Sequence, residues 1–103
     1  MNYIVYVPAT RELCFQGMRE PRSLAFPEQY REVTRIQAPD LRRTFALLQH
    51  GRPGCLMPEG EASFSVGGVL VEEGGLRGPV TLRCLDAGWQ VLTREVLAQG
   101  ELA

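Results

Sequence analysis

The stretch over residues 40–50 has the fewest structural options in this chain. Asp40 can cap a helix, and apolar side chains then recur at the spacing of one helical face. That apolar stripe consists of Leu41, Phe45 and Leu48. Gly51 can adopt the left-handed conformation that ends a helix, and Pro53 prevents the helix from resuming. We therefore expect a helix over residues 40–50 whose stripe packs on the face of a sheet. The side chains expected on that face are Val5, Val69 and Leu82.

Before this helix the chain contains a strand, an irregular connection and an ambiguous element. Residues 3–7 form an unbroken aromatic and β-branched run ended by Pro8, which is typical of a strand covered on both faces. Residues 9–28 have no regular period, so we expect an irregular connection with one helical turn around Arg11–Phe15. Residues 29–38 fit either a strand or a helix, and their β-branched side chains favour a strand.

Three further strands are expected after the helix. Residues 63–73 resemble a strand in which Gly67–Gly68 marks a bulge or a close backbone approach. Residues 80–84 alternate apolar and polar side chains, which is typical of a strand with one buried face. The tight connection Asp86–Gly88 leads to a last strand, whose continuation over residues 90–98 fits either strand or helix.

The order of these elements and the composition define the fold class. The 103 residues are 45% hydrophobic and 22% charged, values of an ordinary globular chain, so we expect a single domain over residues 1–103. The expected fold is α+β, with a small antiparallel or mixed β-sheet of about five strands and one main helix packed on one face. Three widely spaced cysteines and a start without a basic leader or a long apolar run predict a cytoplasmic protein with no membrane span.

A loop rich in Gly and Pro over residues 51–62 is long for so small a domain, which is typical of functional or interface loops. Leu56 and Met57 lie between Gly and Pro residues, and we expect them to be exposed as the apolar centre of a protein interface. Arg52 and Glu59 would form its charged rim. The alternative is that the two apolar side chains fold back on the sheet edge. Further binding candidates are Arg42, Arg43, His50 and Trp89.

Arginine supplies all the basic side chains apart from one histidine, and its planar guanidinium suits bidentate contacts with carboxylate or phosphate. Four arginines precede or begin the expected helix, namely Arg31, Arg35, Arg42 and Arg43. They could bind nucleic acid, provided that they share one exposed face. The net charge of −1 does not favour a nucleic-acid binder, and a solvated helix face is the simpler interpretation.

The only histidine, His50, lies five residues before Cys55 and could act as its base in a Cys/His enzyme. Such a pair needs a fixed arrangement and an orienting third group, which the sequence does not identify. Together with Cys14 and Cys84 the two residues have the composition of a zinc site, but no C-x₂-C pair is present. We therefore expect no metal, no cofactor and no catalytic residues.

Short motifs in the helix and after the loop resemble a family of small uncharacterised proteins carried by bacterial plasmids, phages and integrated elements. That family's pattern is D-L-x-x-x-F-x-L-T-[NQ]-H-G, then R-S-x-S-V-G-D-V and a late G-[FW]. The matching residues are Asp40, Leu41, Phe45, Leu47, Gln49, His50 and Gly51, then Ser63, Ser65, Val66, Gly67 and Val69, and finally Gly88 and Trp89. Leu48 replaces the Thr of the pattern and Gly68 replaces its Asp.

The resemblance implies an accessory protein of a mobile element, and it implies no activity. Together with the loop, it predicts a non-catalytic module that binds a host protein, for instance one of a defence system, or another element-encoded protein. Self-association is the other protein contact to expect. A domain that contacts nucleic acid and a Cys/His enzyme remain as alternatives.

Overall fold

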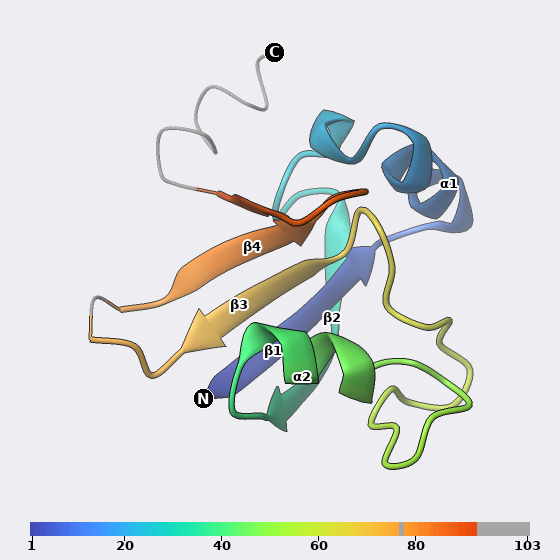
Figure 1. The fold of residues 1–103 in the computed structure, drawn as a ribbon. Coiled ribbons are helices and arrows are strands. Elements are labelled where there is room, and N and C mark those ends of the chain that lie inside the picture. The colour runs from blue at the N-terminus through green and yellow to red at the C-terminus, as the bar shows by residue number, and fades with distance from the viewer. Residues whose placement is uncertain (77, 93–103) are drawn as a thin grey trace.

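The computed structural model describes residues 1–76 and 78–92, and these form a five-stranded sheet with two helices (Figure 1). The elements in chain order are β1 (Asn2–Pro8), α1 (Arg11–Arg19), the 3-10 turn η1 (Pro21–Ser23), β2 (Tyr30–Gln37), α2 (Leu41–Leu47), β3 (Val69–Glu73), β4 (Val80–Cys84) and β5 (Trp89–Val91). The strand order is β2-β1-β3-β4-β5, and all neighbours are antiparallel. The expected α+β class is thereby confirmed. In the described part of the chain, no helix is long and apolar enough to span a membrane.

β1 is a central strand, as its unbroken apolar run predicted, because it lies between β2 and β3. The segment 30–37, for which strand and helix were both open, is the edge strand β2. A bulge at Val33 interrupts its pairing with β1, since Val5 pairs with Thr34 whereas the next residue, Tyr6, pairs with Glu32. The bulge shifts the alternation of side chains along β2. Arg31 and Arg35, which lie four apart on either side of the bulge, therefore point to opposite faces of the sheet.

Helix α2 covers one face of the sheet, near the start of β1 (Figure 1). Its N-terminus is capped as expected, because the Asp40 carboxylate accepts the backbone N–H of Arg43 at 2.8 Å. It ends earlier than expected, at Leu47, and Leu48 continues the buried stripe from the turn that follows. Leu48 is fully buried with Val5, whereas Leu41 and Phe45 are only half-buried at the border of this core.

Both faces of the sheet are covered, and this corrects two expectations. Val69 was expected beneath the helix stripe, but it belongs to a second cluster on the opposite face. β4 was expected to bury one face only, yet Arg83 is 3% exposed and extends into this second cluster. Its guanidinium donates to the Leu24 carbonyl and lies 6.0 Å from the centre of the Tyr30 ring, so these contacts compensate in part for burial of the charge, whereas its buried Nε has no hydrogen-bond partner among the described residues.

Helix α1 is longer than the single turn expected around Arg11–Phe15. The Thr10 hydroxyl caps it by accepting the N–H of Leu13 at 3.2 Å, and it continues through Gly17 to Arg19. Gly17 does not break the helix, because it is buried where α1 meets the backbone before β3. A Cβ atom at Gly67, which has φ +94°, would lie 2.9 Å from the Gly17 carbonyl carbon. The predicted close backbone approach at Gly67 is confirmed, and α1 is its partner.

The connection between α2 and β3, residues 48–68 and hereafter the α2–β3 loop, is closed by bonds between its own two ends. Gln49 Nε2 donates to the Phe64 carbonyl at 2.8 Å, and the Phe64 N–H donates to the Leu48 carbonyl at 3.1 Å. The backbone N–H of His50 donates to Ser63 Oγ at 2.9 Å. Gln49, His50 and Ser63 belong to the two sequence motifs, and their structural role is to join the two ends of this loop.

Candidate functional site

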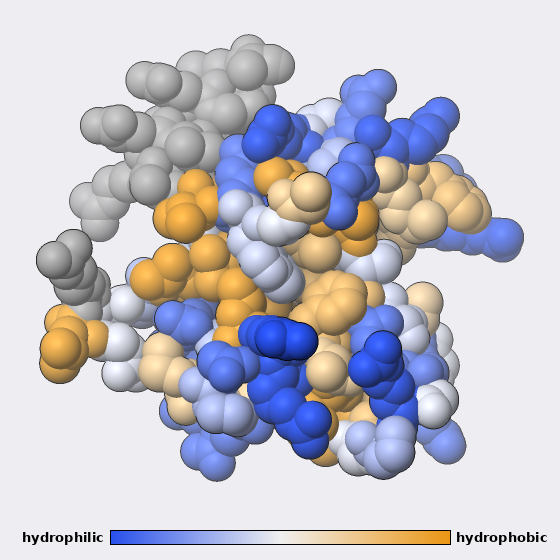
Figure 2. Space-filling model, in the orientation of Figure 1, coloured by the Kyte–Doolittle hydropathy of each residue, from blue (hydrophilic) through white to orange (hydrophobic). Residues whose placement is uncertain are grey.

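A groove lies between α2 and the connection from β4 to β5, and we call it the α2 groove. Its volume is about 450 Å³, and it is lined by Leu41, Arg42 and Phe45 of α2 and by Cys84, Leu85, Gly88 and Trp89. The turn that forms its outer wall has the predicted geometry, because the Leu85 N–H donates to the Gly88 carbonyl and Gly88 has φ +94°. Apolar side chains gather over β4 on the face that carries α2, with hydrophilic side chains of α2 beside them (Figure 2).

The floor of the α2 groove rests on three aromatic rings. Phe45 and Trp89 meet edge to face, with ring centres 6.3 Å apart. Both rings contact Phe64, which is 1% exposed: Trp89 stacks on it at 6.1 Å and Phe45 meets it edge-on at 6.0 Å. These contacts fix Trp89, which is only half-buried, as a rigid aromatic surface open to a partner.

The adjacent arginines of α2 differ in their place on the helix. Arg42 and Arg43 are both exposed, but only Arg42 lines the α2 groove. Within residues 1–76 and 78–92 neither arginine forms an ion pair. Arg42 is therefore a cation beside an apolar groove, available to a carboxylate that comes from outside the described residues.

The other two candidate arginines are already paired and lie on different faces. Arg31 holds Glu61 in a bidentate contact at 2.6 and 3.0 Å, and Arg35 holds Glu32 at 3.0 Å. Because of the β2 bulge, Arg31 is paired with a β1 residue of the α2 face and Arg35 with one of the opposite face. The four arginines thus do not form the shared basic face that nucleic-acid binding requires.

Of the two apolar side chains expected in an interface on the α2–β3 loop, only one is exposed. Met57 is 5% exposed and belongs to the core beneath α2, so the expectation of an exposed Met57 is wrong. Leu56 is 46% exposed, as expected, although its backbone N–H is fixed to the Leu47 carbonyl at 2.7 Å. Arg52 and Glu59 are exposed. Met57 is buried because the loop folds back on the core, which was the alternative considered for these two side chains.

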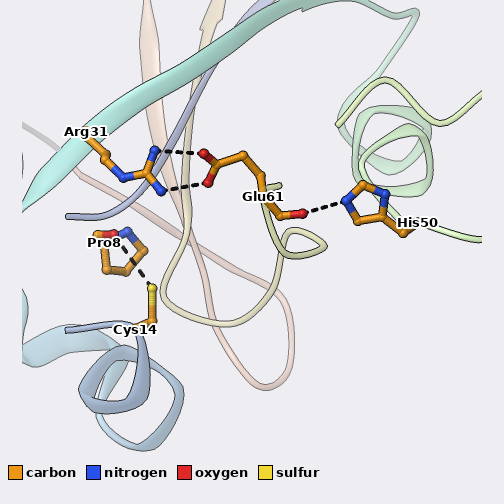
Figure 3. Close-up of polar contacts among 5 residues, drawn as sticks. All are labelled: Pro8, Cys14, Arg31, His50 and Glu61. Atoms are coloured by element: carbon orange, nitrogen blue, oxygen red, sulfur yellow. Dashed lines mark hydrogen bonds and ion pairs between the residues drawn. The ribbon is translucent and has the colours of Figure 1, made fainter. Parts of the chain in front are cut away.

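His50 and Cys55 are in contact, although no third group that would orient them could be identified from the residue types. The His50 Nδ1 atom lies 3.7 Å from Cys55 Sγ, and its Nε2 atom lies 2.6 Å from the Glu61 carbonyl oxygen. The side chain of Glu61 is in turn held by Arg31, so one chain of contacts runs from β2 to the imidazole (Figure 3). His50 is exposed and Cys55 half-buried, and neither lines the α2 groove.

A second cavity of about 450 Å³ separates α1 from residues 60–68, and we call it the α1 cavity. Phe15 and Met18, which are 52% and 51% exposed, lie at its border, and its charged groups include the mutually paired Arg31 and Glu61. This cavity was not expected, because an irregular connection over residues 9–28 offers no helix through Met18 to line it. The i, i+3 spacing of Phe15 and Met18 after a Thr cap was the available signal.

Among the described residues, no three His, Cys, Asp or Glu side chains come together as a set of metal ligands. Cys14 donates to the Pro8 carbonyl, and Cys84 is buried in the core, both away from the contact between His50 and Cys55. Comparisons with known protein families, with curated proteins and with solved structures find no match for this chain. The geometry of its own side chains therefore carries the functional argument.

Proposed function

We propose that this chain is a non-catalytic protein-binding module and that its partner docks in the α2 groove. The observation that carries the proposal is the combination of an apolar groove, a rigid half-buried Trp89 and Arg42 without an ion pair among the described residues. Tryptophan and arginine are enriched among the residues that dominate binding energy at protein interfaces.

The groove favours a partner segment that carries an apolar side chain next to a carboxylate. The apolar side chain would bury itself against Phe45 and Trp89, and the carboxylate would pair with Arg42. The α1 cavity is a weaker choice, because Arg31 and Glu61 neutralise each other at its wall and its other cation, Arg11, lies 5.6 Å from the centre of the Phe15 ring.

The sequence resemblance to proteins of plasmids and phages supports a host protein, such as a component of a defence system, or another element-encoded protein as the partner. Nucleic acid is less favoured, since two of the four candidate arginines are paired with carboxylates. A Cys/His enzyme would need a substrate cavity beside the thiol, and Cys55 lines neither the α2 groove nor the α1 cavity.

Two charge reversals on the same helix test the proposal. Arg42→Glu and Arg43→Glu change the net charge equally, but only Arg42 lines the groove. Tagged wild type and both variants are used to capture partners from a lysate of host cells, followed by mass spectrometry. The partner is then purified and titrated into each variant while the fluorescence of Trp89, the only tryptophan, is recorded.

We expect wild type and Arg43→Glu to bind the same protein and to change Trp89 fluorescence. Arg42→Glu should weaken binding by about fivefold or more, because truncation or reversal at such a position costs over about 1 kcal/mol. Equal binding by Arg42→Glu, or a wild-type chain that captures nothing beyond the tag control, would refute the groove as the docking site. Capture of a second copy of this chain alone would replace a heterologous partner with self-association.

A further inference from the structure

The three cysteines of this chain have different hydrogen-bond partners. Cys14 Sγ lies 3.6 Å from the Pro8 carbonyl oxygen, and Cys84 Sγ lies 3.7 Å from that of Leu85. A carbonyl oxygen accepts a hydrogen bond from a thiol, but it cannot take up the proton. Burial raises the pKa of both thiols, and the charge of Asp86 raises that of Cys84 further. Both shifts disfavour the thiolate, which is the reactive form.

Cys55 differs because its neighbour is a base. The Glu61 carbonyl oxygen, 2.6 Å from His50 Nε2, can only accept a hydrogen bond, so in the neutral ring Nε2 carries the proton. The lone pair of Nδ1 then faces Cys55 Sγ at 3.7 Å, where it can accept the thiol proton. Cys55 is half-buried, as Cys14 is, so a small reagent can reach both thiols, and the neighbouring base is what distinguishes Cys55.

The residues on either side of this contact are themselves held: His50 through its backbone and Glu61 through its side chain. The backbone N–H of His50 donates to Ser63 Oγ at 2.9 Å, and the acceptor residue Glu61 is fixed by its bidentate contact with Arg31 (Figure 3). The Nδ1 atom of His50 is thereby kept beside the Cys55 thiol, as the geometry of a nucleophile and its base requires.

We propose that Cys55 is the selectively nucleophilic thiol of this chain, with His50 as its proton acceptor, and that it is a site for mixed-disulfide formation with low-molecular-mass disulfides. His50 Nδ1 takes the thiol proton, and the Cys55 thiolate attacks one sulfur of the disulfide. A new S–S bond forms at Cys55 while the old S–S bond breaks. Its electron pair leaves on the second sulfur, which receives the proton and departs as a thiol. Cys55 is oxidised and the departing sulfur is reduced, so no further oxidant is needed.

The sequence makes the three thiols easy to follow separately. Trypsin places them on the peptides 12–19, 44–77 and 84–94, because Pro53 blocks cleavage after Arg52. The full chain is treated with limiting iodoacetamide near neutral pH, digested, and analysed by mass spectrometry over time. We expect the peptide of Cys55 to be labelled about tenfold faster than the other two, since the thiolate is the reacting form.

His50→Gln is the matched variant, because its amide N–H can still donate to the Glu61 carbonyl but cannot accept a thiol proton. We expect labelling of Cys55 to slow about tenfold while the rates of Cys14 and Cys84 stay unchanged. The buried Cys84 also reports on folding, since it would become reactive if the variant unfolded. In that case, the comparison is repeated with His50→Asn, a shorter amide that also lacks a base.

A second arm uses oxidised glutathione as the probe. The adduct should appear on the peptide of Cys55 alone and form more slowly in His50→Gln. Three thiols that react within about threefold of one another would overturn the proposal, as would a Cys55 rate that does not depend on His50. Selective alkylation without any glutathione adduct would also overturn it, because the site would then not accept disulfides.

Discussion

Gly68 lies against the ring of Phe64, and this close approach allows a quantitative test of the core. A Cβ atom at position 68 would lie 2.5 Å from Cε1 and 2.7 Å from Cζ of that ring. The ring cannot move aside easily, because it is 1% exposed and in contact with Phe45 and Trp89. Overpacking of this kind costs about 1–3 kcal/mol. The loss of unfolded-state freedom in a Gly→Ala change offsets about 0.4–1 kcal/mol, so Gly68→Ala should destabilise the chain by roughly 1–2 kcal/mol.

Urea titration followed by Trp89 fluorescence measures this loss. Gly75→Ala is the matched control, because among residues 1–76 and 78–92 a Cβ there would meet only the Gly78 carbonyl oxygen, at 3.8 Å. We expect the control to be as stable as wild type or slightly more stable. Phe64→Leu removes the two ring atoms in the clash, so in that background the cost of Gly68→Ala should fall by about half or more. The account is refuted if Gly68→Ala is as stable as Gly75→Ala. It is also refuted if the stability losses of Phe64→Leu and Gly68→Ala add up in the double variant.

Two further predictions concern the α2–β3 loop. Met57→Ser should lower the free energy of unfolding by about 2–5 kcal/mol, because Met57 is 5% exposed, whereas Leu56→Ser should change it by less than about 0.5 kcal/mol. Urea titration of both variants checks this, and the reverse order would contradict the burial described above. The Arg31 guanidinium holds the pKa of the Glu61 carboxyl below its usual 4.5, so their contact stabilises the fold above that pH and is lost as the pH falls through the lowered pKa. Glu61→Gln should cost less than about 1 kcal/mol near neutral pH, because Arg31 is half exposed, and it should lose less stability than wild type on acidification. Urea midpoints of wild type and Glu61→Gln, measured as the pH falls through this range, test the prediction. If both proteins lose the same stability on acidification, the pair of Arg31 and Glu61 does not contribute.

Local signals in the sequence were sufficient for α2 and for most strands. Asp40 caps α2 through its own side chain, and the β-branched residues of 30–37 do form a strand. Such features depend on neighbours within a few residues, so they survive whatever the rest of the chain does. The prediction for residues 93–98 lies outside the described residues.

Long-range packing decided the points that the sequence did not predict. Residues 9–28 were expected to be mostly irregular, yet α1 continues through Gly17, whose missing side chain leaves room for the backbone at Gly67. The alternation of β4 indicated a solvent face, but residues 24–30 cover it and enclose Arg83. Neither effect has a signature in the residues next to it.

The candidate sites show the same difference between local sequence signals and long-range packing. Arg42 and Trp89 were named from the sequence, but only the fold brings them to one groove and separates Arg42 from Arg43. The spacing of His50 and Cys55 suggested a pair, whereas the group that orients the imidazole is the backbone carbonyl of Glu61. A backbone acceptor leaves no trace in the residue types, so no reading of side chains could have found it.

The closure of the α2–β3 loop at its base also determines how freely its length can change. Gln49 and His50 fasten one end of the loop to Ser63 and Phe64 at the other, so the exposed tip over residues 51–54 is not needed to hold those ends together. Extra residues inserted at the tip would extend into solvent, and doubling the length of such a closed segment costs only about 0.6 kcal/mol in chain entropy. The tip is thus a position where related chains can gain or lose residues, and where an epitope can be placed, while the sheet and the α2 groove stay as they are.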